Sequence, residues 1–365
     1  MNKRFIPLDI LRGITIALMI TVNTPGSWAH VYPPFLHAEW NGCTLTDLVF
    51  PFFLFIVGAA IYFSFKKYDY QMNSAVAKKV VKRMLLIFFI GLALNAFPFI
   101  GKDYEKLRIM GVLQRIGIAY GLAAFAILLL KDVKHLLVFS VVLLLGYWGL
   151  MYVGAPGDPY GLETNFGRQI DLKVLGANHL WHGKGMAFDP EGLLSTMPSI
   201  VSVIAGFLSI RLILNKEFTW MKTLVFGIGL LILGWIWGQF FPINKSLWTS
   251  SYVVFTTGWA VISLGVIHAL SRGDLFNKVM KPFIILGSNP LFIFILSGVV
   301  VKTYFRIHLM SNDGQERNMY SYLYHDLMLP AFGQMNGSLM FALAHLFVFF
   351  LIAWAMYRKG IFIKI

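Results

Sequence analysis

The sequence predicts an all-α polytopic membrane protein, a bundle of about ten transmembrane helices in one domain that spans residues 1–365. The chain is 58% hydrophobic and 13% charged, and it contains 33 Phe. This composition leaves too little polar surface for a soluble protein. Several apolar runs approach or exceed the roughly 20 residues that cross a bilayer as a helix. The short alternating segments of a transmembrane β-barrel are missing, so a helical bundle is expected.

Ten apolar runs are the predicted membrane spans. They cover residues 8–28, 46–65, 84–100, 112–130, 135–153, 191–214, 222–241, 248–270, 282–301 and 338–357. With the N-terminus in the cytoplasm, most of the 31 Lys and Arg fall in the inner loops or the C-terminal tail. The positive-inside rule therefore predicts that both termini are cytoplasmic. A compact chain without organelle signals favours a bacterial protein, and we expect a multi-pass protein of the cytoplasmic (inner) membrane.

The charge and the cysteine content exclude several function classes. The net charge of +14 does not indicate nucleic-acid binding, because basic residues are scattered singly between apolar runs. The single Cys43 excludes an intramolecular disulfide framework. His179 and His182 have a spacing seen in metal ligands, but no third ligand lies in register, so no metal is expected. The lipid bilayer is the expected environment, and a homodimer stays open.

The first predicted span begins with PLDILRG and carries polar residues that are costly in lipid without a partner or a task. Asp9 and Arg12 are three residues apart and can pair on one helical face. The pair either anchors the helix, or Arg12 meets an anionic ligand that enters from the cytoplasm. Asn23 follows Arg12 by about three turns, so both point along one side of the helix. Asn23 either bonds a neighbouring helix or belongs to a site.

The segment HAEWNG, between the first two spans, contains the histidine that carries most of the functional prediction. The imidazole of His37 can take a proton from an attacking amine or hydroxyl near neutral pH, or accept an acyl group itself. A lone histidine in an outer loop is more often structural. Glu39, Asn41 and Asp47 lie within ten residues of it, which favours a site. Pro51 is expected to kink the next span and to leave backbone groups for a ligand.

Further polar residues stand at the starts of later spans. Arg115, in RIMGVLQRIG, either pairs with a buried acid or contacts a ligand. In FDPEGLLST, Asp189 is the expected N-cap of a helix with Pro190 at its first position. Glu191 is then free to meet an amino group or Arg115. Asn244, in PINKSLW, stands at another helix entrance, where small polar residues usually indicate close helix packing.

Taken together, these blocks resemble the heparan-α-glucosaminide N-acetyltransferase family of transmembrane acetyltransferases. The blocks that carry the resemblance are PLDILRG, VNTPG, HAEWNGCTLTDLVFPFFLFIVG, RIMGVLQRIG, DPEGLLST, PINKSLWTSSYV, GSNPL and YRKGIFIKI. They cover nearly the whole chain in the expected order. The resemblance implies transfer of an acetyl group from cytosolic acetyl-CoA to the amine of a glucosamine residue across the membrane. The family's catalytic histidine falls on His37, and its important asparagine falls on Asn23.

The predicted site combines what the residue pattern indicates with what the family resemblance implies. His37 is the expected general base, and Asn23 or a backbone N–H near Pro51 stabilises the oxyanion; Asp47 is the third expected catalytic residue. The acetyl-CoA phosphates are expected near Arg4, Arg12 and Lys364. The residues expected to contact the acceptor are Glu39, Trp40, Asn41, Arg115, Glu191 and Asn244. Direct attack and an acetyl-His37 intermediate both fit this set.

Two questions stay open at the level of sequence. The acceptor is expected to be a small amino sugar or glycan fragment, glucosamine first, with hydroxyl acetylation as an alternative to N-acetylation. The rival function class is an amino-sugar transporter or permease in which His37 and Asp47 couple transport to protons. The lack of a detectable internal repeat gives the common inverted-repeat transporter architecture no support.

Overall fold

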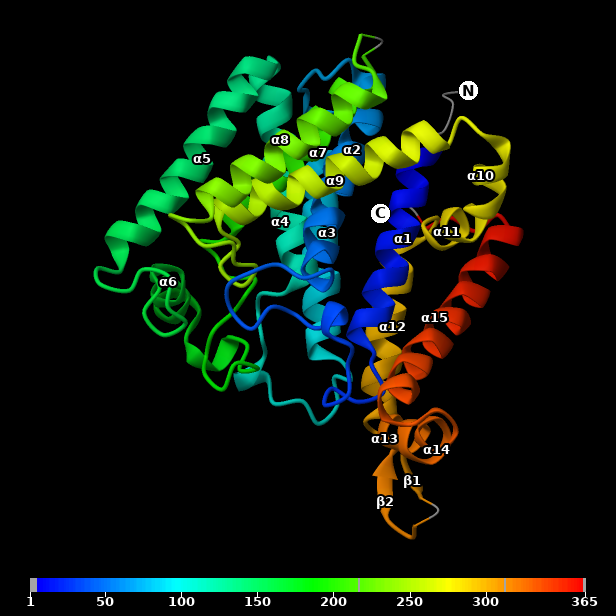
Figure 1. Cartoon of the computed structure of the whole chain (residues 1–365). Coiled ribbons are helices and arrows are strands. Elements are labelled where there is room, and N and C mark those ends of the chain that lie inside the picture. Colours follow the sequence, from blue (N-terminus) through cyan, green and yellow to red (C-terminus); the bar gives the residue numbers. More distant parts are fainter. Residues whose placement is uncertain (1–4, 216, 312, 364–365) are drawn as a thin grey trace.

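The computed structural model describes residues 5–215, 217–311 and 313–363, and these ranges are mostly helical (Figure 1). Within them, eight helices are long and apolar enough to cross a membrane. They are α1 (Ile6–Asn23), α2 (Val49–Phe65), α4 (Val112–Leu130), α5 (Val133–Gly154), α7 (Thr196–Ile213), α8 (Trp220–Trp237), α9 (Ser250–Leu270) and α15 (Gln334–Arg358). The chain is therefore an all-α multi-pass membrane protein in outline, as its sequence predicts.

The remaining elements are shorter or more polar. The α-helices among them are α3 (Ser74–Ala96), α6 (Phe166–Leu175), α10 (Asp274–Val279), α11 (Lys281–Leu286), α12 (Pro290–Tyr304), α13 (Met319–Tyr322) and α14 (Leu329–Phe332). The single turns are η1 (Pro33–Phe35), η2 (Thr46–Leu48), η3 (Lys66–Tyr68), η4 (Tyr104–Lys106), η5 (Ala177–His179) and the π-helical η6 (Leu323–Met328). Strands β1 (His308–Met310) and β2 (Glu316–Asn318) pair antiparallel in a hairpin that projects from the helices (Figure 1).

The predicted count of about ten spans is not confirmed. Each of the ten apolar runs contains a helix, but two of these helices fall short of a clear span. The helix α12 has only 15 residues, because the run is broken between Leu286, where α11 ends, and Pro290. The helix α3 has 23 residues, but its first half carries a cluster of basic side chains. These are Lys78, Lys79, Lys82 and Arg83.

The two ends of the described chain lie at one end of the bundle. In Figure 1, α1 begins and α15 ends at the same end, in the upper half of the view. This arrangement agrees with termini on one side of the membrane. That this side is the cytoplasm stays a prediction from the distribution of Lys and Arg.

The helices α2 and α7 pack with their backbones in close contact at the centre of the bundle. A Cβ atom at Gly58 would overlap the carbonyl oxygen of Val203, and one at Gly206 would overlap the carbonyl oxygen of Phe55. Small residues allow this approach and are enriched wherever membrane helices cross closely. The contact fixes α2, and with it the loop that precedes α2.

Replacing Gly58 with alanine should therefore destabilise the protein, by at least about 2 kcal/mol, because a methyl group there meets backbone that cannot rotate away. Thermal unfolding of the purified protein in detergent measures the effect as a drop in Tm. Gly229→Ala is the matched control, because a Cβ at this helical glycine meets nothing within 4 Å. Equal Tm values for the two variants would contradict the close α2–α7 contact.

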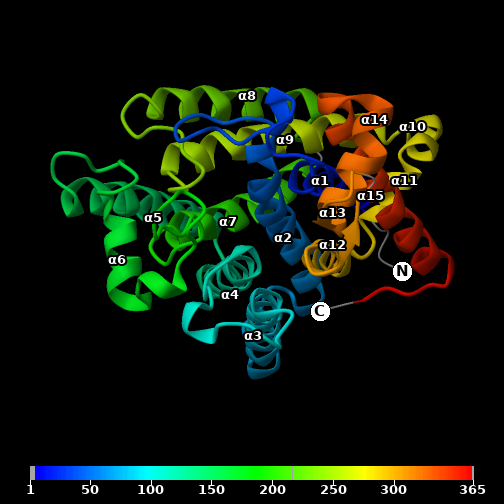
Figure 2. The same cartoon turned by 90° about the horizontal axis from the view of Figure 1, so that it is seen from below.

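The connections at the end of the bundle where α2 begins fold over the ends of the helices. In Figure 2, the connection between α1 and α2 lies across the α8 and α9 region. The contact is made to the α8–α9 connection, where the backbone N–H of Gly42 donates to the carbonyl of Ile243 at 2.7 Å. The long segment after α5, which includes α6, borders the same loops. Residues far apart in sequence are thereby brought together around HAEWNG.

Candidate functional site

His37 and Asp47 form the centre of the candidate site. The two side chains are joined by a hydrogen bond of 2.7 Å between Nδ1 of His37 and Oδ1 of Asp47. The Asp47 side chain is 1% exposed, whereas that of His37 is 45% exposed. A carboxylate accepts the hydrogen bond, so Nδ1 carries the proton, and Nε2 keeps its lone pair as an acceptor. This is the tautomer that a general base needs.

The local sequence holds Asp47 in place. Its second oxygen, Oδ2, accepts hydrogen bonds from the backbone N–H of Ala38, the backbone N–H of Thr44 and the Thr44 hydroxyl, each at 3.0 Å. The pattern Thr-x-x-Asp, with the acid bonded back to the threonine N–H, is a capping arrangement at the start of a helical segment. Here it opens η2, which continues into α2. Four hydrogen bonds therefore keep a buried carboxylate ionised and fix its direction toward His37.

Pro51 does not break α2, contrary to the prediction. It is the third residue of the helix, which starts at Val49. The first four N–H groups of a helix have no partner within the helix, so a proline there removes no hydrogen bond. The predicted free backbone groups near Pro51 are therefore not created by a kink.

Lys245 completes the cluster, although the sequence did not single it out. Its Nζ lies 3.1 Å from Nδ1 and 3.3 Å from Nε2 of His37, and 3.7 Å from Oδ1 of Asp47. The side chain is 22% exposed. Burial lowers the pKa of the Lys245 ammonium, and the nearby Asp47 carboxylate acts in the opposite direction. The site is thus an imidazole between an anion and a cation.

Asn244 and Asn41 were predicted to contact the acceptor, and the structure shows both in a clamp between two loops. The Asn244 amide is fully buried and donates to Oδ1 of Asn41 at 3.1 Å. Its own Oδ1 accepts from the backbone N–H of Leu247 at 2.9 Å. The clamp joins the HAEWNG loop to the turn that carries Lys245. It explains how residues about 200 positions apart meet with fixed geometry.

Trp40 and Glu39 face other outer segments. The indole Nε1 of Trp40 donates to the carbonyl of Tyr160 at 2.9 Å, and its ring packs against Phe188. The backbone carbonyl of Glu39 accepts from Nζ of Lys184 at 2.7 Å, and Glu39 itself is exposed. The long segment after α5 therefore borders the loop of His37, which keeps the predicted acceptor-binding role of Trp40 and Glu39 as a proposal.

A second cluster of charges corrects the sequence prediction for residues 188–199. Arg108 binds Asp189 through two hydrogen bonds of 2.8 and 2.6 Å and Glu191 through one of 2.5 Å. Burial alone lowers the pKa of Arg108, but the bonds and charges of its two acidic partners raise it overall. Asp189 is not a helix N-cap, because α7 starts only at Thr196. Glu191 pairs with Arg108 rather than with Arg115.

Arg115 is a buried structural cation in this structure. It is 0% exposed, and its Nη2 donates to the carbonyl of Gly192 at 3.2 Å and to the Ser195 hydroxyl. Its guanidinium lies over the ring of Trp248, 5.1 Å from the centroid. Within the described chain, its Nε and Nη1 make no hydrogen bond. A role of Arg115 in acceptor binding stays a proposal, and it would require the residues that bury Arg115 to move apart.

Asp171, on α6, binds the backbone of the segment that precedes α7. Its carboxyl makes the stability of the fold depend on pH. Its Oδ1 accepts from the Leu193 backbone N–H at 2.8 Å. Burial raises the pKa of Asp171 from 3.8 to about 6. Below pH 3.8 the Asp171 carboxyl is protonated in both the folded and the unfolded protein, and above about pH 6 it is ionised in both. Stability contributed by the neutral form is therefore lost as pH rises through this window, by up to about 3 kcal/mol.

Replacing Asp171 with asparagine should raise Tm at pH 7.5 and leave it nearly unchanged at pH 4, because the amide keeps an acceptor for Leu193 and carries no charge. Thermal unfolding at the two pH values measures the difference. Glu163→Gln, at an exposed position, is the control and should show no such dependence. A lower Tm for Asp171→Asn at pH 7.5 would show that the ionised carboxylate stabilises the fold.

The structure does not bring Asn23 into the cluster around His37. Asn23 is the exposed last residue of α1. Arg12 pairs with Asp9 at 3.0 Å and donates to the carbonyl of Gly287 at 3.4 Å, at the break between α11 and α12. Arg4 and Lys364, the other predicted phosphate contacts, lie outside the described residues. The catalytic role of Asn23 and the three phosphate contacts therefore stay proposals.

A cavity of about 700 Å³ separates α1 from α9. Its lining includes Leu11 and Leu18 of α1, Phe255 and Ile267 of α9, and Thr44 in the loop before η2. The lining along the helices is mostly apolar, with Thr15 and Ser263 as its polar residues, and it reaches Thr44, which bonds Asp47. His37 is not among the lining residues. The predicted single tunnel from Arg12 to His37 is therefore not continuous in this structure.

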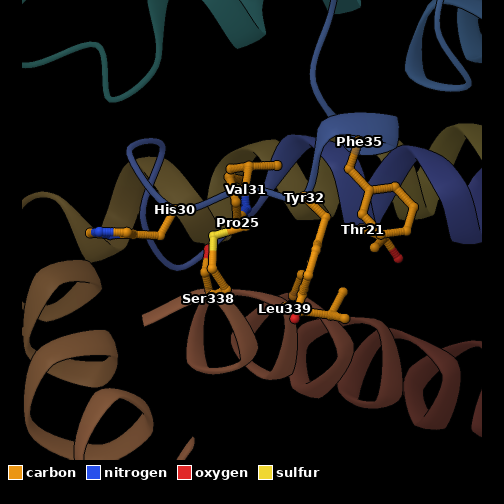
Figure 3. A pocket seen from close by; sticks show the side chains of 10 residues that line it. Thr21, Pro25, His30, Val31, Tyr32, Phe35, Ser338 and Leu339 are labelled. Atoms are coloured by element: carbon orange, nitrogen blue, oxygen red, sulfur yellow. The ribbon is translucent and has the colours of Figure 1, made fainter. Parts of the chain in front are cut away.

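A second, much smaller cavity of about 10 Å³ lies between the end of α1 and α15 (Figure 3). Thr21, Pro25, Tyr32 and Phe35 line it from one side, and Ser338 lines it from α15. This volume has room for about one water molecule and none for a sugar or a thioester. The described residues contain no group of three or more His, Cys, Asp or Glu side chains that could hold a metal ion.

Comparison with known proteins shows what this chain is similar to. Residues 4–157 match the family model described as heparan-alpha-glucosaminide N-acetyltransferase, catalytic. Heparan-alpha-glucosaminide N-acetyltransferase from Homo sapiens is 29% identical over 420 aligned positions, which cover 98% of this chain and 59% of the human protein. The chain is similar to heparan-α-glucosaminide N-acetyltransferases. The Mus musculus protein of the same name is 28% identical over 98% of the chain and 60% of its own length.

This relationship confirms the resemblance predicted from the sequence blocks. The chain spans about three fifths of the length of the curated heparan-α-glucosaminide N-acetyltransferases it matches. His37 and Asp47 lie inside the segment that the family model matches, whereas Lys245 lies outside it. The whole-chain similarity extends to Lys245, which the local sequence alone gave no reason to select.

Proposed function

We propose that this chain transfers an acetyl group from cytosolic acetyl-CoA to the amine of a glucosamine-type sugar on the outer side of the membrane. The observation that carries the proposal is the His37–Asp47 pair, which joins a 45% exposed imidazole to a buried carboxylate in a chain similar to N-acetyltransferases. A bacterial cytoplasmic membrane is the proposed location, with the acceptor on its periplasmic side. His37 is the proposed general base, and Asp47 holds it in the Nδ1–H tautomer.

In the proposed step, the sugar amine attacks the carbonyl carbon of the thioester. The C–N bond forms, the amine proton passes to Nε2 of His37, and the carbonyl electrons move to the oxygen. Collapse of this intermediate breaks the C–S bond. The departing CoA thiolate takes the proton from the His37 imidazolium and leaves as the thiol. Asp47 stabilises the imidazolium while it exists.

The cavity between α1 and α9 suits the pantetheine arm of the donor but not its nucleotide. From Phe255 to Ile267 the lining of α9 extends about 18 Å at 1.5 Å per residue. No Lys or Arg belongs to the lining, so the phosphates would lie beyond its inner end, where Arg4, Arg12 and Lys364 remain the proposed contacts. At the outer end, the turn of Thr44 separates the cavity from His37 and would have to move to admit the thioester.

An acetyl-His37 intermediate is the second mechanism that the same pair supports. Nε2 would then attack the thioester, and the acetyl group would be carried to the sugar in a second half-reaction. Steady-state kinetics separate the two routes. Intersecting initial-rate lines are expected for direct attack, which needs a ternary complex, and parallel lines would indicate the acetyl-enzyme.

The amino-sugar transporter is less well supported by the position of the pair. His37 and Asp47 lie in and directly after the connection between α1 and α2, before α2 begins at Val49. Proton-coupling groups of transporters are expected deep in the membrane between helices. A pair at the start of α2 favours chemistry on a molecule that arrives from the connecting loops.

Radiolabelled acetyl-CoA and a panel of sugars test the proposed function. Purified protein in detergent should convert glucosamine, and not glucose, to an acetylated product that resists hydroxylamine. Resistance identifies an amide, whereas a hydroxylamine-sensitive product would identify O-acetylation. Absence of any acetylated product with folded protein would overturn the enzymatic function.

A further inference from the structure

We infer that Lys245 is a catalytic residue of the proposed transfer, and that its ammonium group stabilises the oxyanion formed on the thioester carbonyl. This inference rests on the proposed function. It assigns to Lys245 the oxyanion-stabilising role that was predicted for Asn23 or for backbone near Pro51. The structure places Asn23 at the exposed end of α1 and Pro51 in an unbroken first turn of α2.

The position of the ammonium next to the imidazole carries the inference. Nζ of Lys245 is nearly equidistant from the two ring nitrogens of His37, at 3.1 and 3.3 Å. The lone-pair directions of these nitrogens diverge, so Nζ lies off the axis along which Nε2 would accept a proton. An amine on that axis would be about 3 Å from Nε2. The carbonyl it attacks can then be oriented with its oxygen toward Nζ.

The ammonium group of Lys245 also keeps N–H donors beyond its contact with His37. Its nearest described carboxylate oxygen is Oδ1 of Asp47 at 3.7 Å, which is longer than the roughly 2.8 Å of a good charge-assisted hydrogen bond. Asp47 already accepts four hydrogen bonds from His37, Ala38 and Thr44. Lys245 is therefore not needed to satisfy Asp47. With three N–H donors and partial exposure, it can turn toward a substrate oxygen.

The turn that carries Lys245 is rigid, as a preorganised donor requires. The carbonyl of Lys245 accepts the backbone N–H of Trp248 at 3.0 Å. Trp248 is itself held at a positive φ of 52°, a conformation that costs energy for a bulky residue and persists only when its surroundings enforce it. Its side chain is fully buried against Arg115 and Tyr252.

In the assigned step, the amine forms the C–N bond while the carbonyl electron pair moves to oxygen. The ammonium of Lys245 donates a hydrogen bond to this oxyanion and keeps its own proton. The electron pair returns when the C–S bond breaks, and the contact weakens again. Because the charge exists only near the transition state, loss of Lys245 should lower kcat and leave KM nearly unchanged.

The test compares Lys245→Met and Lys245→Arg with Lys173→Met, a control at an exposed position on α6. We expect kcat of Lys245→Met to fall about 10²- to 10³-fold with KM for both substrates within about twofold. Lys245→Arg should recover a large part of this loss, because it restores a cationic donor. Lys173→Met should match the unmodified protein. If Lys245→Met does not fold, Lys245→Gln takes its place.

A second acyl donor distinguishes stabilisation of the oxyanion by Lys245 from a role in which Lys245 only positions His37. Fluoroacetyl-CoA forms a more stable oxyanion than acetyl-CoA, so the kcat deficit of Lys245→Met should shrink at least tenfold with it. Equal deficits for the two donors would overturn the inference in favour of a positioning role, and kcat within threefold of the unmodified protein would overturn it outright. Inactivity of the unmodified protein itself would instead remove the proposed function.

Discussion

Replacing His37 with alanine is expected to lower kcat for acetyl transfer to glucosamine by about 10²- to 10⁴-fold, the usual contribution of a positioned general base. The imidazole Nε2 is the ring nitrogen that the hydrogen bond to Asp47 leaves unprotonated. Without it, the sugar amine has no group to take its proton as it attacks the thioester carbon. The measurement is the initial rate with labelled acetyl-CoA at saturating sugar.

The control for this prediction is His30→Ala. His30 lies in the same connection between α1 and α2 and borders the small cavity of about 10 Å³. It should retain the activity of the unmodified protein. Protein yield and Tm must match across the set, because His37 is partly exposed and its loss should cost little stability. Normal acetyl transfer by folded His37→Ala would show that another group is the base.

Replacing Asp47 with asparagine is expected to lower kcat by about 10³-fold, although the substitution changes the size of the side chain very little. The amide has one acceptor oxygen and two N–H donors where the carboxylate accepts four hydrogen bonds. It cannot both satisfy the Thr44 donors and accept from Nδ1 of His37. The imidazole is then free to adopt the Nε2–H tautomer, in which the catalytic nitrogen carries a proton and cannot act as a base.

This variant also separates catalysis from structure. Asp47 is 1% exposed, so the asparagine should lower Tm as well, because donors around Oδ2 lose part of their partner. If the deficit in kcat only reflected misfolding, it would scale with the unfolded fraction and disappear at a lower assay temperature. We expect it to persist there. An Asp47→Asn protein with more than a tenth of the normal kcat would contradict the orientation role.

The local part of the site could be predicted from the sequence. His37 and Asp47 are ten residues apart, and the Thr-x-x-Asp pattern that holds Asp47 is itself a local capping signal. The family resemblance added the role of His37. Lys245 could not be found in this way, because a single lysine in a short turn is typical of topology and its contact with His37 bridges more than 200 residues.

The wrong prediction for Asp189 has a similar cause. The order Asp-Pro-Glu before an apolar run is typical of a helix start, and the sequence offers no local reason to reject it. Arg108, 81 residues earlier, binds both acids and delays the helix to Thr196. Tertiary ion pairing thus overrides a local capping signal, and hydrogen-bond partners at such distances are not visible in a single sequence.

The helical architecture was predictable because hydropathy is averaged over whole spans, and each apolar run contains a helix. The number of clear spans was not, because composition does not show where a run is interrupted. The Gly287–Asn289 break shortens α12 to 15 residues. At this break, Asn289 bonds the returning C-terminal segment through Ile361 and Ile363. That contact, too, joins distant parts of the chain.

Transfer across a sealed membrane tests the central claim most directly. The protein is reconstituted into liposomes that enclose glucosamine, and labelled acetyl-CoA is added outside. The account predicts labelled N-acetylglucosamine inside the vesicles, formed only by the molecules whose cytoplasmic face points outward and abolished by His37→Ala. Accumulation or release of unmodified glucosamine without labelled product would contradict the account and would identify the chain as a transporter.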